Sequence, residues 1–438
     1  MTELTVYAAG VVVILLIYSW SRRLVAARQR TRFERARGQE DMEPASLHPV
    51  IDPARCMGCG ACVKACPEGD VLGIVDGKAR LVTAQNCIGH GACAKACPYD
   101  AIELVFGTER RGVDIPQVER NFETNVEGLF ISGELGGMGL VANAVEQGCQ
   151  AVEYIAKRVN GSKSSLKDDL GLVIVGAGPS GIAASLMAKK LGLKFVTLEQ
   201  DTLGGTVTHF PRHKVVMTRP VKLPLYGSLK VRRVEKEKLV EMWRDVIART
   251  GIEPRFGCRV ERVTKQDGGF VVTTENQEHY RSRCVLLAIG RRGTPRRLGV
   301  PGEESRKVFY RLLDPEQYTD ADLLVVGGGD SALESAMILA GESGNRVTLS
   351  YRGTSVYRAK PENRSRFQSF VDDGRIAVLW ESTVAEIKSR SVVIETPAGE
   401  QEIDNDWVLV SAGGVLPTAF LQQAGVEVRT WHGVSPGR

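Results

Sequence analysis

Short apolar runs and helical patterns alternate along the second half of the chain. From residue 171 onward, runs of Val, Ile and Leu are followed by segments in which apolar residues recur at helical spacing. This order begins twice, near residue 172 and near residue 323. Such alternation is typical of parallel sheets whose strands are joined by helices. We therefore predict the α/β fold class, with two Rossmann-like dinucleotide-binding domains.

The chain between 107 and 170 shows a shorter version of the same pattern. Residues 128–132 read as a strand, and residues 140–159 have the apolar spacing of an amphipathic helix. The polar stretch 160–169 has the composition of a flexible linker.

The N-terminus carries one long apolar run, residues 5–20, which is followed by Arg22 and Arg23. Its length is close to the lower limit for a membrane-spanning helix. A signal peptide, the alternative, would place its positive charges before the apolar run. We predict a single-pass transmembrane helix over 1–23 in the cell inner membrane. The positive-inside rule puts its N-terminus outside and the catalytic domains in the cytoplasm.

Charge is concentrated just after that run. Residues 22–37 hold seven Arg and one Glu, whereas the whole chain of 438 residues has a net charge of +5. The rest of the chain is therefore close to neutral, which argues against a broad nucleic-acid surface. We expect the arginines after the apolar run to lie along anionic lipid headgroups, and a solvated basic linker is compatible with that. Those arginines are Arg28, Arg30, Arg32, Arg35 and Arg37.

Seven of the ten cysteines lie between 56 and 97. "CMGCGACVKACP" (56–67) has the spacing C-x2-C-x2-C-x3-C-P, and "CIGHGACAKACP" (87–98) repeats it with His90 in place of a cysteine. Three thiolates on one glycine-containing loop suit a [4Fe-4S] cluster. Zinc fits less well, because zinc sites usually pair two two-ligand knuckles.

The stretch from 56 to 97 resembles a bacterial two-cluster ferredoxin. The resemblance implies one [4Fe-4S] cluster on Cys56, Cys59, Cys62 and Cys97, and a second cluster on Cys66, Cys87 and Cys93. For the fourth position of the second cluster, three readings stay open. They are a [4Fe-4S] cluster with His90 as ligand, a [3Fe-4S] cluster with His90 idle, and no second cluster.

"LVIVGAGPSGIAASLMAKKLGLKFVTLEQ" (172–200) combines a strand, G-x-G-x-x-G, a helix, a second strand and an acid. Gly176 permits the tight turn, Gly178 permits approach of a pyrophosphate, and Gly181 permits close packing of helix and strand. Glu199 ends the second strand, where an acid accepts hydrogen bonds from a ribose.

Two further stretches, "LGGTVTHFP" (203–211) and "VLLAIGRRGTPRRLGVPGE" (285–303), resemble the thioredoxin-reductase-like flavoproteins. The resemblance implies that the first domain holds FAD. No cysteine pair follows "GGT"; His209 stands there, either near the flavin or as a polar loop residue. The residues expected at FAD are Gly176, Gly178, Pro179, Ser180, Gly181, Glu199, Gly204, Gly205, Thr206 and Gly290.

The second domain repeats the motif as G-x-G-x-x-A. Its second strand ends at Arg352 without an acid, and Arg358 follows shortly after. A guanidinium can grip a 2′-phosphate, so we predict NADPH and keep NADH open. The residues expected at the nicotinamide cofactor are Gly327, Gly329, Asp330, Ser331, Ala332, Arg352 and Arg358.

The segment 122–148 resembles the piece that closes the FAD domain at the end of the chain in that family. Here it precedes the FAD domain, so we predict a circular permutation. Gly133 and Glu134 would lie at the flavin, although the family carries Asp where Glu134 stands. The alternative is that 107–158 caps the ferredoxin-like domain without touching FAD.

These segments give the expected domain order and function. The expected domains are 1–23 transmembrane anchor, 24–50 basic juxtamembrane linker, 51–106 ferredoxin-like α+β domain, 107–159 relocated FAD-domain segment, 160–170 linker, 171–300 FAD domain with return strands to 315 and after 405, 316–405 NAD(P)H domain and 406–438 C-terminal return segment.

We predict a membrane-anchored oxidoreductase that passes electrons from NAD(P)H through FAD to iron–sulfur clusters, with no catalytic side chain. A low-molecular-weight disulfide reductase and a non-catalytic electron-transfer or redox-sensing subunit are the alternatives. The sequence leaves a homodimer open and does not name the electron-acceptor or donor protein.

Overall fold

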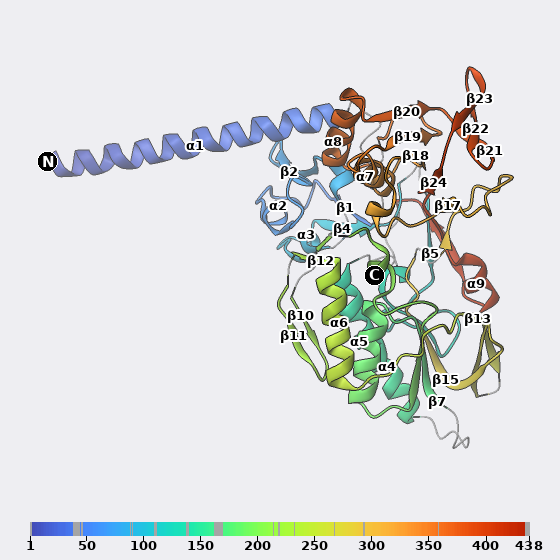
Figure 1. The fold of residues 1–438 in the computed structure, drawn as a ribbon. Helices are drawn as coiled ribbons and strands as arrows, with labels where there is room; N and C mark the ends of the chain where they lie inside the picture. Colours follow the sequence, from blue (N-terminus) through green and yellow to red (C-terminus); the bar gives the residue numbers. More distant parts are fainter. Residues whose placement is uncertain are drawn as a thin grey trace. The chain divides into compact units, whose positions relative to one another are not determined.

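The computed structural model describes residues 2–37, 44, 47–87, 89, 91–108, 112–136, 140–161, 170–212, 214–217, 220–231, 233–266, 268–291, 294–357 and 359–433. The chain divides into two compact units, one of residues 1–113 with 431–438 and one of residues 114–430. Figure 1 shows the order of the elements along the chain.

Helix α1 (Thr2–Arg37) opens the first unit. No helix among the described residues is long and apolar enough to cross a membrane. The structure therefore does not support the predicted transmembrane helix over 1–23. The apolar run of α1 covers only residues 5–20, which is shorter than the roughly 20 apolar residues that a spanning helix needs.

The second half of α1 packs on the cysteine-rich domain. The side-chain Oε1 of Gln29 accepts a hydrogen bond from the backbone N–H of Ile74 at 2.8 Å. Arg32 pairs with Asp70 at 2.7 Å, and Arg30 lies 3.7 Å from Asp76. These two arginines thus contact acids of the cysteine-rich domain, where lipid headgroups were expected.

The cysteine-rich domain consists of two antiparallel strand pairs and short helices. β1 pairs with β4, and β2 pairs with β3. Its core contains cysteines together with small aliphatic residues such as Val71 and Leu72. The elements are β1 (His48–Ile51), α2 (Ala61–Ala65), β2 (Leu72–Val75), β3 (Lys78–Leu81), η2 (Ala84–Asn86), α3 (Ala92–Lys95) and β4 (Ile102–Val105).

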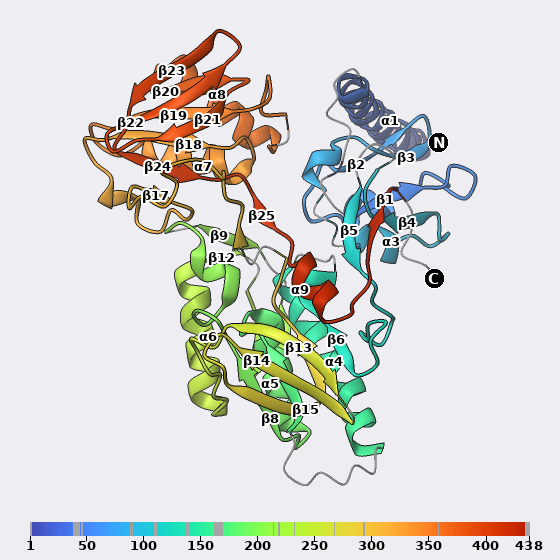
Figure 2. The ribbon, with the colours of Figure 1, turned by 90° about the vertical axis from the view of Figure 1, so that its right-hand side faces the viewer.

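The second unit begins with the first α/β fold, built on a six-stranded sheet in which β13, β14, β15, β7 and β8 follow one another. The parallel strand β7 is buried along almost its whole length, as expected of a strand covered on both faces. Figure 2 shows α4, α5 and α6 gathered beside this sheet. The elements are α4 (Val141–Gly161), β7 (Leu170–Val175), α5 (Pro179–Lys190), β8 (Phe195–Leu198), α6 (Lys236–Thr250), β13 (Val260–Gln266), β14 (Gly269–Thr274) and β15 (His279–Leu287).

Strand β6 (Leu129–Ile131), from the predicted relocated segment, lies in this same sheet. It pairs in parallel with Val285, Leu286 and Leu287 of β15. Its three residues are fully buried, and Leu129 and Ile131 share a core with Val173 and Val285. The upstream segment is therefore a structural part of the first α/β fold.

Two small antiparallel pairs extend the first α/β fold after the short helix η4 (Gly205–His209). β9 pairs with β12, and β10 pairs with β11. Their buried residues, including Val216 and Leu223, join a core formed with α5 and α6. The elements are β9 (Val215–Met217), β10 (Val221–Leu223), β11 (Gly227–Leu229) and β12 (Arg233–Glu235).

The second α/β fold has a five-stranded parallel sheet in the order β17, β24, β18, β19, β20. Strand β24 (Trp407–Val410) lies between β17 and β18, past the predicted domain boundary at 405. The other elements are β17 (Val308–Phe309), η5 (Pro315–Gln317), β18 (Asp322–Val326), α7 (Asp330–Leu339), β19 (Arg346–Tyr351), α8 (Pro361–Asp372), β20 (Ile376–Trp380), β21 (Thr383–Ile387), β22 (Ser391–Thr396) and β23 (Gly399–Asp404).

The C-terminal part returns to the first α/β fold. Leu421 of α9 (Thr418–Gln423) and the nearby Val426 are buried in the core that contains β6 and β7. The remaining elements are β5 (Val113–Pro116), η3 (Gly133–Gly136), β16 (Thr294–Pro295), β25 (Gly414–Val415) and β26 (Val428–Trp431), of which β16 pairs with β25 and β5 with β26.

Candidate cofactor sites

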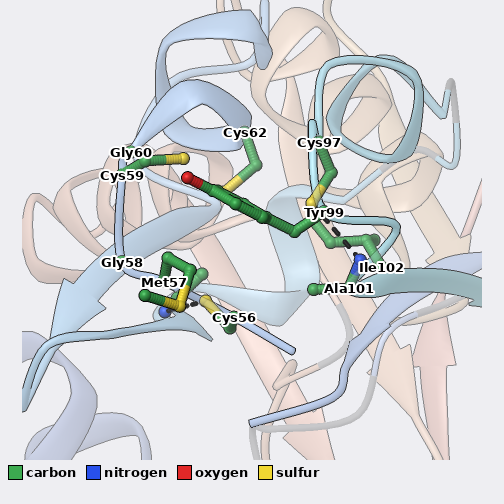
Figure 3. Close-up of a pocket in the computed structure, with 11 residues that line it drawn as sticks. Cys56, Met57, Gly58, Cys59, Gly60, Cys62, Cys97, Tyr99, Ala101 and Ile102 are labelled. Atoms are coloured by element: carbon green, nitrogen blue, oxygen red, sulfur yellow. Dashed lines mark hydrogen bonds between the residues drawn. The ribbon is translucent and has the colours of Figure 1, made fainter. Parts of the chain in front are cut away.

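Four cysteines line one pocket of the cysteine-rich domain. Figure 3 shows the side chains of Cys56, Cys59, Cys62 and Cys97 around one space, with the ring of Tyr99 drawn across it. The backbone N–H of Ala79 donates to Cys56 Sγ at 3.3 Å, and that of Ala101 donates to Cys97 Sγ at 3.4 Å. Such N–H groups stabilise negative charge on sulfur, which suits thiolate ligands. The structure thus brings together the four residues predicted for the first cluster.

The two cysteine motifs fold alike. Gly60 before α2 has φ 75° and ψ 6°, and Gly91 before α3 has φ 73° and ψ 5°. Gly58 and Gly89 also adopt positive φ, and a Cβ on Gly58 would stand 2.1 Å from the carbonyl oxygen of Gly77. Each loop therefore needs glycine at both positions, and the described glycines of the second motif have the backbone conformation of those in the first.

Three cysteines of the second predicted ligand set, Cys66, Cys87 and Cys93, belong to the same small core. Burial, with a smaller contribution from the neighbouring thiols of Cys87 and Cys66, raises the pKa of the Cys93 thiol to about 11. Burial also raises the pKa of the Cys66 and Cys87 thiols. Metal ligation must displace these protons, so burial couples cluster assembly to deprotonation.

The nature of the second cluster stays a prediction. His90 lies outside the described residues. Among those described, no group of three or more His, Cys, Asp or Glu side chains is arranged to hold a metal ion. Both ligand sets therefore rest on the motif, and the first set also on the pocket that its four cysteines line.

The glycine loop of the first α/β fold is shaped by close backbone contacts. Gly176 has φ 106°, and a Cβ on Gly181 would stand 1.8 Å from the carbonyl oxygen of Gly176. A Cβ on Gly178 would meet only the Cα of Gly205, at 4.0 Å, and α5 begins at the next residue, Pro179. The loop is thus packed where it turns and open where it faces the N-terminus of a helix, which fits a phosphate group.

Glu199, directly after β8, is hydrogen-bonded to the backbone of this loop. Its side chain is 6% exposed and accepts hydrogen bonds from the backbone N–H of Ala177 at 2.6 Å and of Asp201 at 3.0 Å. Burial raises the pKa of this carboxyl group. Glu199 therefore stands beside the glycine loop, and its contact with a ribose stays a prediction.

The segment around Gly133 reaches the same loop. Ser132 and Ser180 hydroxyl oxygens lie 2.7 Å apart, and Gln147 Oε1 accepts from the backbone N–H of Gly133 at 2.9 Å. A Cβ on Gly133 would lie 3.1 Å from the Cβ of Ser180. Two predicted site residues far apart in sequence thus become neighbours. Ser132 and Gln147 were not predicted, because only their long-range contacts mark them.

The second α/β fold has a comparable loop. Gly327 has φ 143°, and a Cβ there would stand 2.5 Å from the carbonyl oxygen of Ser411, whereas Gly329 faces open space. Ala332 is fully buried. Asp330 Oδ1 accepts from the backbone N–H of Lys360 and from Asn363 Nδ2, both at 2.8 Å. The acid at the start of α7 is therefore engaged with α8.

The remaining predicted residues are placed as follows. Arg352 is exposed directly after β19, and Ser331 and Thr206 are also exposed. Gly290 has φ 67°, and nothing lies within 4 Å of a Cβ built there. Arg358 lies outside the described residues, so its predicted contact with a 2′-phosphate has no structural description.

His209 belongs to an ion-pair group. Its Nε2 lies 3.0 Å from Asp201 Oδ2, and Arg311 Nη1 lies 3.0 Å from both ring nitrogens. Burial and the charge of Arg311 lower the pKa of His209. Arg311 could not be predicted as the partner of His209, because 102 positions separate the two residues.

The cysteines outside the ferredoxin-like domain are buried or half-buried thiols. Burial raises the pKa of Cys149 and of Cys284 to about 12 in each case. Cys258 is 9% exposed, and its pKa is also raised by burial. Thiols of this kind are weak nucleophiles.

Comparisons with known proteins show which families and relatives the chain is similar to. The model of the pyridine nucleotide-disulphide oxidoreductase family matches residues 173–435, and that of the 4Fe-4S dicluster domain matches residues 48–98. Bacilliredoxin reductase Bdr of Bacillus subtilis is 30% identical over 264 residues, which cover 58% of this chain and 80% of that protein. Ferredoxin–NADP reductase of Ignicoccus hospitalis is 29% identical over 264 residues, with 59% and 81% covered.

A solved structure, bacillithiol disulfide reductase Bdr from Bacillus cereus, is 26% identical, with a TM-score of 0.52 and coverage of 58% of this chain and 81% of that chain. The family match spans more than half of the chain. The chain therefore belongs to the pyridine nucleotide-disulphide oxidoreductase family and, with its dicluster domain, is an iron–sulfur flavoprotein oxidoreductase that uses FAD, NAD(P)H and 4Fe-4S clusters.

Proposed function

We propose that the protein moves electrons between NAD(P)H and a one-electron protein partner through FAD and its own iron–sulfur clusters. The observation that carries this proposal is the presence, in one chain, of two open glycine loops and a pocket lined by four cysteines. Bound FAD would supply the chemistry that joins two-electron hydride transfer to one-electron transfer.

The residues of the chain contribute binding and orientation. The N-terminus of α5 and the open loop at Gly178 would hold the FAD pyrophosphate, and Glu199 would face the ribose. The loop at Gly327 and Gly329 would hold the second dinucleotide, and the four-cysteine pocket would hold the first cluster. No side chain is assigned as an acid or base.

An anaerobic assay with NADPH and a one-electron dye tests the proposal. We expect NADPH oxidation coupled to dye reduction by the purified flavoprotein. A protein that binds FAD but oxidises no NADPH with any dye would instead be a non-catalytic electron-transfer subunit.

Disulfide reduction is the second candidate function, since relatives of the chain are named bacilliredoxin reductase and thioredoxin reductase. The buried thiols of Cys258 and Cys284 and the half-buried thiol of Cys149 argue against a reactive cysteine pair in the chain itself. Turnover of an oxidised small thiol by a variant without the cluster cysteines would favour this candidate.

We propose NADPH as the preferred cofactor because of Arg352. It follows the C-terminal end of the parallel strand β19, the edge of the sheet at which dinucleotides bind, and it is exposed. Arg352→Ala is expected to raise the half-saturating NADPH concentration about tenfold, and to leave that for NADH nearly unchanged, through loss of a charge-assisted phosphate contact.

The matched control is Arg306→Ala, because Arg306 is also exposed but precedes the N-terminal end of β17, at the opposite edge of the sheet. Steady-state kinetics measure the half-saturating concentrations of NADPH and NADH for both variants. Equal losses with NADPH and NADH in Arg352→Ala would refute a role in 2′-phosphate recognition.

We also propose that the chain is a circular permutant of its family. The supporting geometry is the parallel pairing of β6 with β15 and the close packing of α4 on α5, where a Cβ on Gly148 would stand 2.2 Å from the carbonyl oxygen of Ser180. A segment that precedes the phosphate loop in the sequence thus completes the fold that follows it.

The cellular location remains a proposal. We propose that α1 contacts a lipid surface, because it exposes Val12, Val13, Ile14, Leu15, Leu16 and Ile17. Deleting residues 1–23 keeps Gln29 and Arg32, which pack on the cysteine-rich domain. The full chain is expected to sediment with anionic vesicles and the shortened chain to stay in the supernatant. Equal sedimentation of both chains would contradict this role of α1.

A further inference from the structure

Several ion pairs join the two α/β folds of the second unit. Lys214 Nζ lies 2.5 Å from Glu334 Oε2, and Arg212 Nε lies 2.6 Å from Asp314 Oδ1. Arg311 lies 3.3 Å from Asp201. In each pair, one residue lies between 201 and 214 and the other between 311 and 334.

The two partners of each pair belong to different parts of the unit. Lys214 stands between η4 and β9, and β9 contributes Val216 to the core of the first α/β fold. Glu334 stands on α7, whose residues form the separate core of the second α/β fold. Arg311 and Asp314 lie in the connection between β17 and β18. Figure 2 shows β9 and β12 at the end of the first α/β fold that meets the second.

The carboxylate of Glu334 is fixed within its own fold. Asn363 of α8, which is 9% exposed, donates through Nδ2 to Glu334 Oε1 at 3.0 Å and to Asp330 Oδ1 at 2.8 Å. The carboxylate is thereby oriented before Lys214 reaches it, which lowers the conformational entropy lost on pairing.

The Lys214–Glu334 pair is partly shielded from water. Its side chains are 31% and 27% exposed, and the ammonium group also lies 5.4 Å from the ring centre of Phe210. A pair of this kind is screened less by salt than a fully exposed pair. It can therefore bias the arrangement of the two folds.

We propose that the Lys214–Glu334 pair, supported by the pairs of Arg212 and Arg311, is a clasp that positions the nicotinamide-binding fold against the flavin-binding fold for hydride transfer. Lys214 and Glu334 are positioning residues, because they act through the placement of the folds and not on the reacting atoms. The inference rests on the proposed function, in which NAD(P)H reduces FAD.

Charge reversal tests the clasp in the full-length protein. The variants are Lys214→Glu, Glu334→Lys and the double exchange that restores an ion pair in the opposite sense. The matched control is Lys388→Glu, because Lys388 pairs with Glu402 at 2.8 Å inside the second α/β fold. Lys388→Glu makes the same change of charge as Lys214→Glu and also breaks an ion pair, but this pair lies within one fold.

Two measurements are made on each variant. Stopped-flow reduction of the flavin over a range of NADPH concentrations gives a limiting rate and an apparent dissociation constant. Hydrogen–deuterium exchange of residues 305–318, measured without nucleotide, reports on the segment of the second α/β fold that carries Arg311 and Asp314. A merely local contribution of Lys214 to folding would not be recovered by reversing both charges.

We expect each single reversal to lower the limiting rate about fivefold or more, with little change in the dissociation constant, and to speed exchange in 305–318. The variant with both charges reversed should restore the limiting rate and the hydrogen–deuterium exchange, and Lys388→Glu should change neither. Single reversals that leave exchange and rate unchanged, or a double exchange that recovers neither, overturn the clasp. Failure of the unaltered protein to oxidise NADPH would overturn the proposed function instead, while the exchange measurement would still report on the clasp.

Discussion

Replacing Gly148 by alanine is expected to raise the dissociation constant for FAD at least about tenfold. The added Cβ would stand 2.2 Å from the carbonyl oxygen of Ser180, so α4 would have to move away from α5. The first turn of α5 follows the phosphate loop directly. Fluorescence titration of the apoprotein with FAD measures the effect.

Gly161→Ala is the control on the same helix, because nothing lies within 4 Å of a Cβ at that position. Circular dichroism and the visible absorbance of the clusters show whether each variant is folded. If Gly148→Ala binds FAD as tightly as the unaltered protein, the upstream segment does not complete the FAD site and the permutation is refuted.

Replacing Cys62 by alanine is expected to remove the first cluster and to lower the iron content by about half. Cys62 is 6% exposed and lines the pocket with Cys56, Cys59 and Cys97, so no solvent ligand can easily take its place. Flavin reduction by NADPH should survive, since the dinucleotide loops lie in the other unit. Iron analysis and paramagnetic resonance of the reduced protein provide the measurement.

Cys258→Ala serves as the control for loss of a buried cysteine outside the ferredoxin-like domain. It should keep its full iron content. A Cys62→Ala protein with unchanged iron and unchanged resonance signals would show that the pocket does not hold a cluster.

Local motifs carried most of the correct predictions. The cysteine loops and the glycine loops need particular residues at fixed short spacing, because a Cβ at Gly58, Gly176 or Gly181 would collide with nearby backbone. Such requirements are visible in the sequence. The segment around Gly133 could be assigned to the first α/β fold because its resemblance to a family segment is also local.

Features that depend on distant partners could not be predicted. The hydrogen bond between Ser132 and Ser180 and the ion pair of Lys214 with Glu334 join residues 48 and 120 positions apart. The transmembrane helix predicted over 1–23 is not supported by the structure, for another reason. Hydropathy along residues 5–20 suggested a span, but this run is shorter than about 20 residues, and no described helix is long and apolar enough to cross a membrane.

The central claim is that electrons pass between the nicotinamide cofactor and the clusters within one chain. It is tested most directly by photoreducing the holoprotein under anaerobic conditions, adding excess NADP⁺, and following cluster resonance signals by rapid freezing. We expect the cluster signals to disappear as NADPH forms, with about two NADPH per chain from one FAD and two clusters. Formation of only one NADPH, with the cluster signals unchanged, would contradict the account.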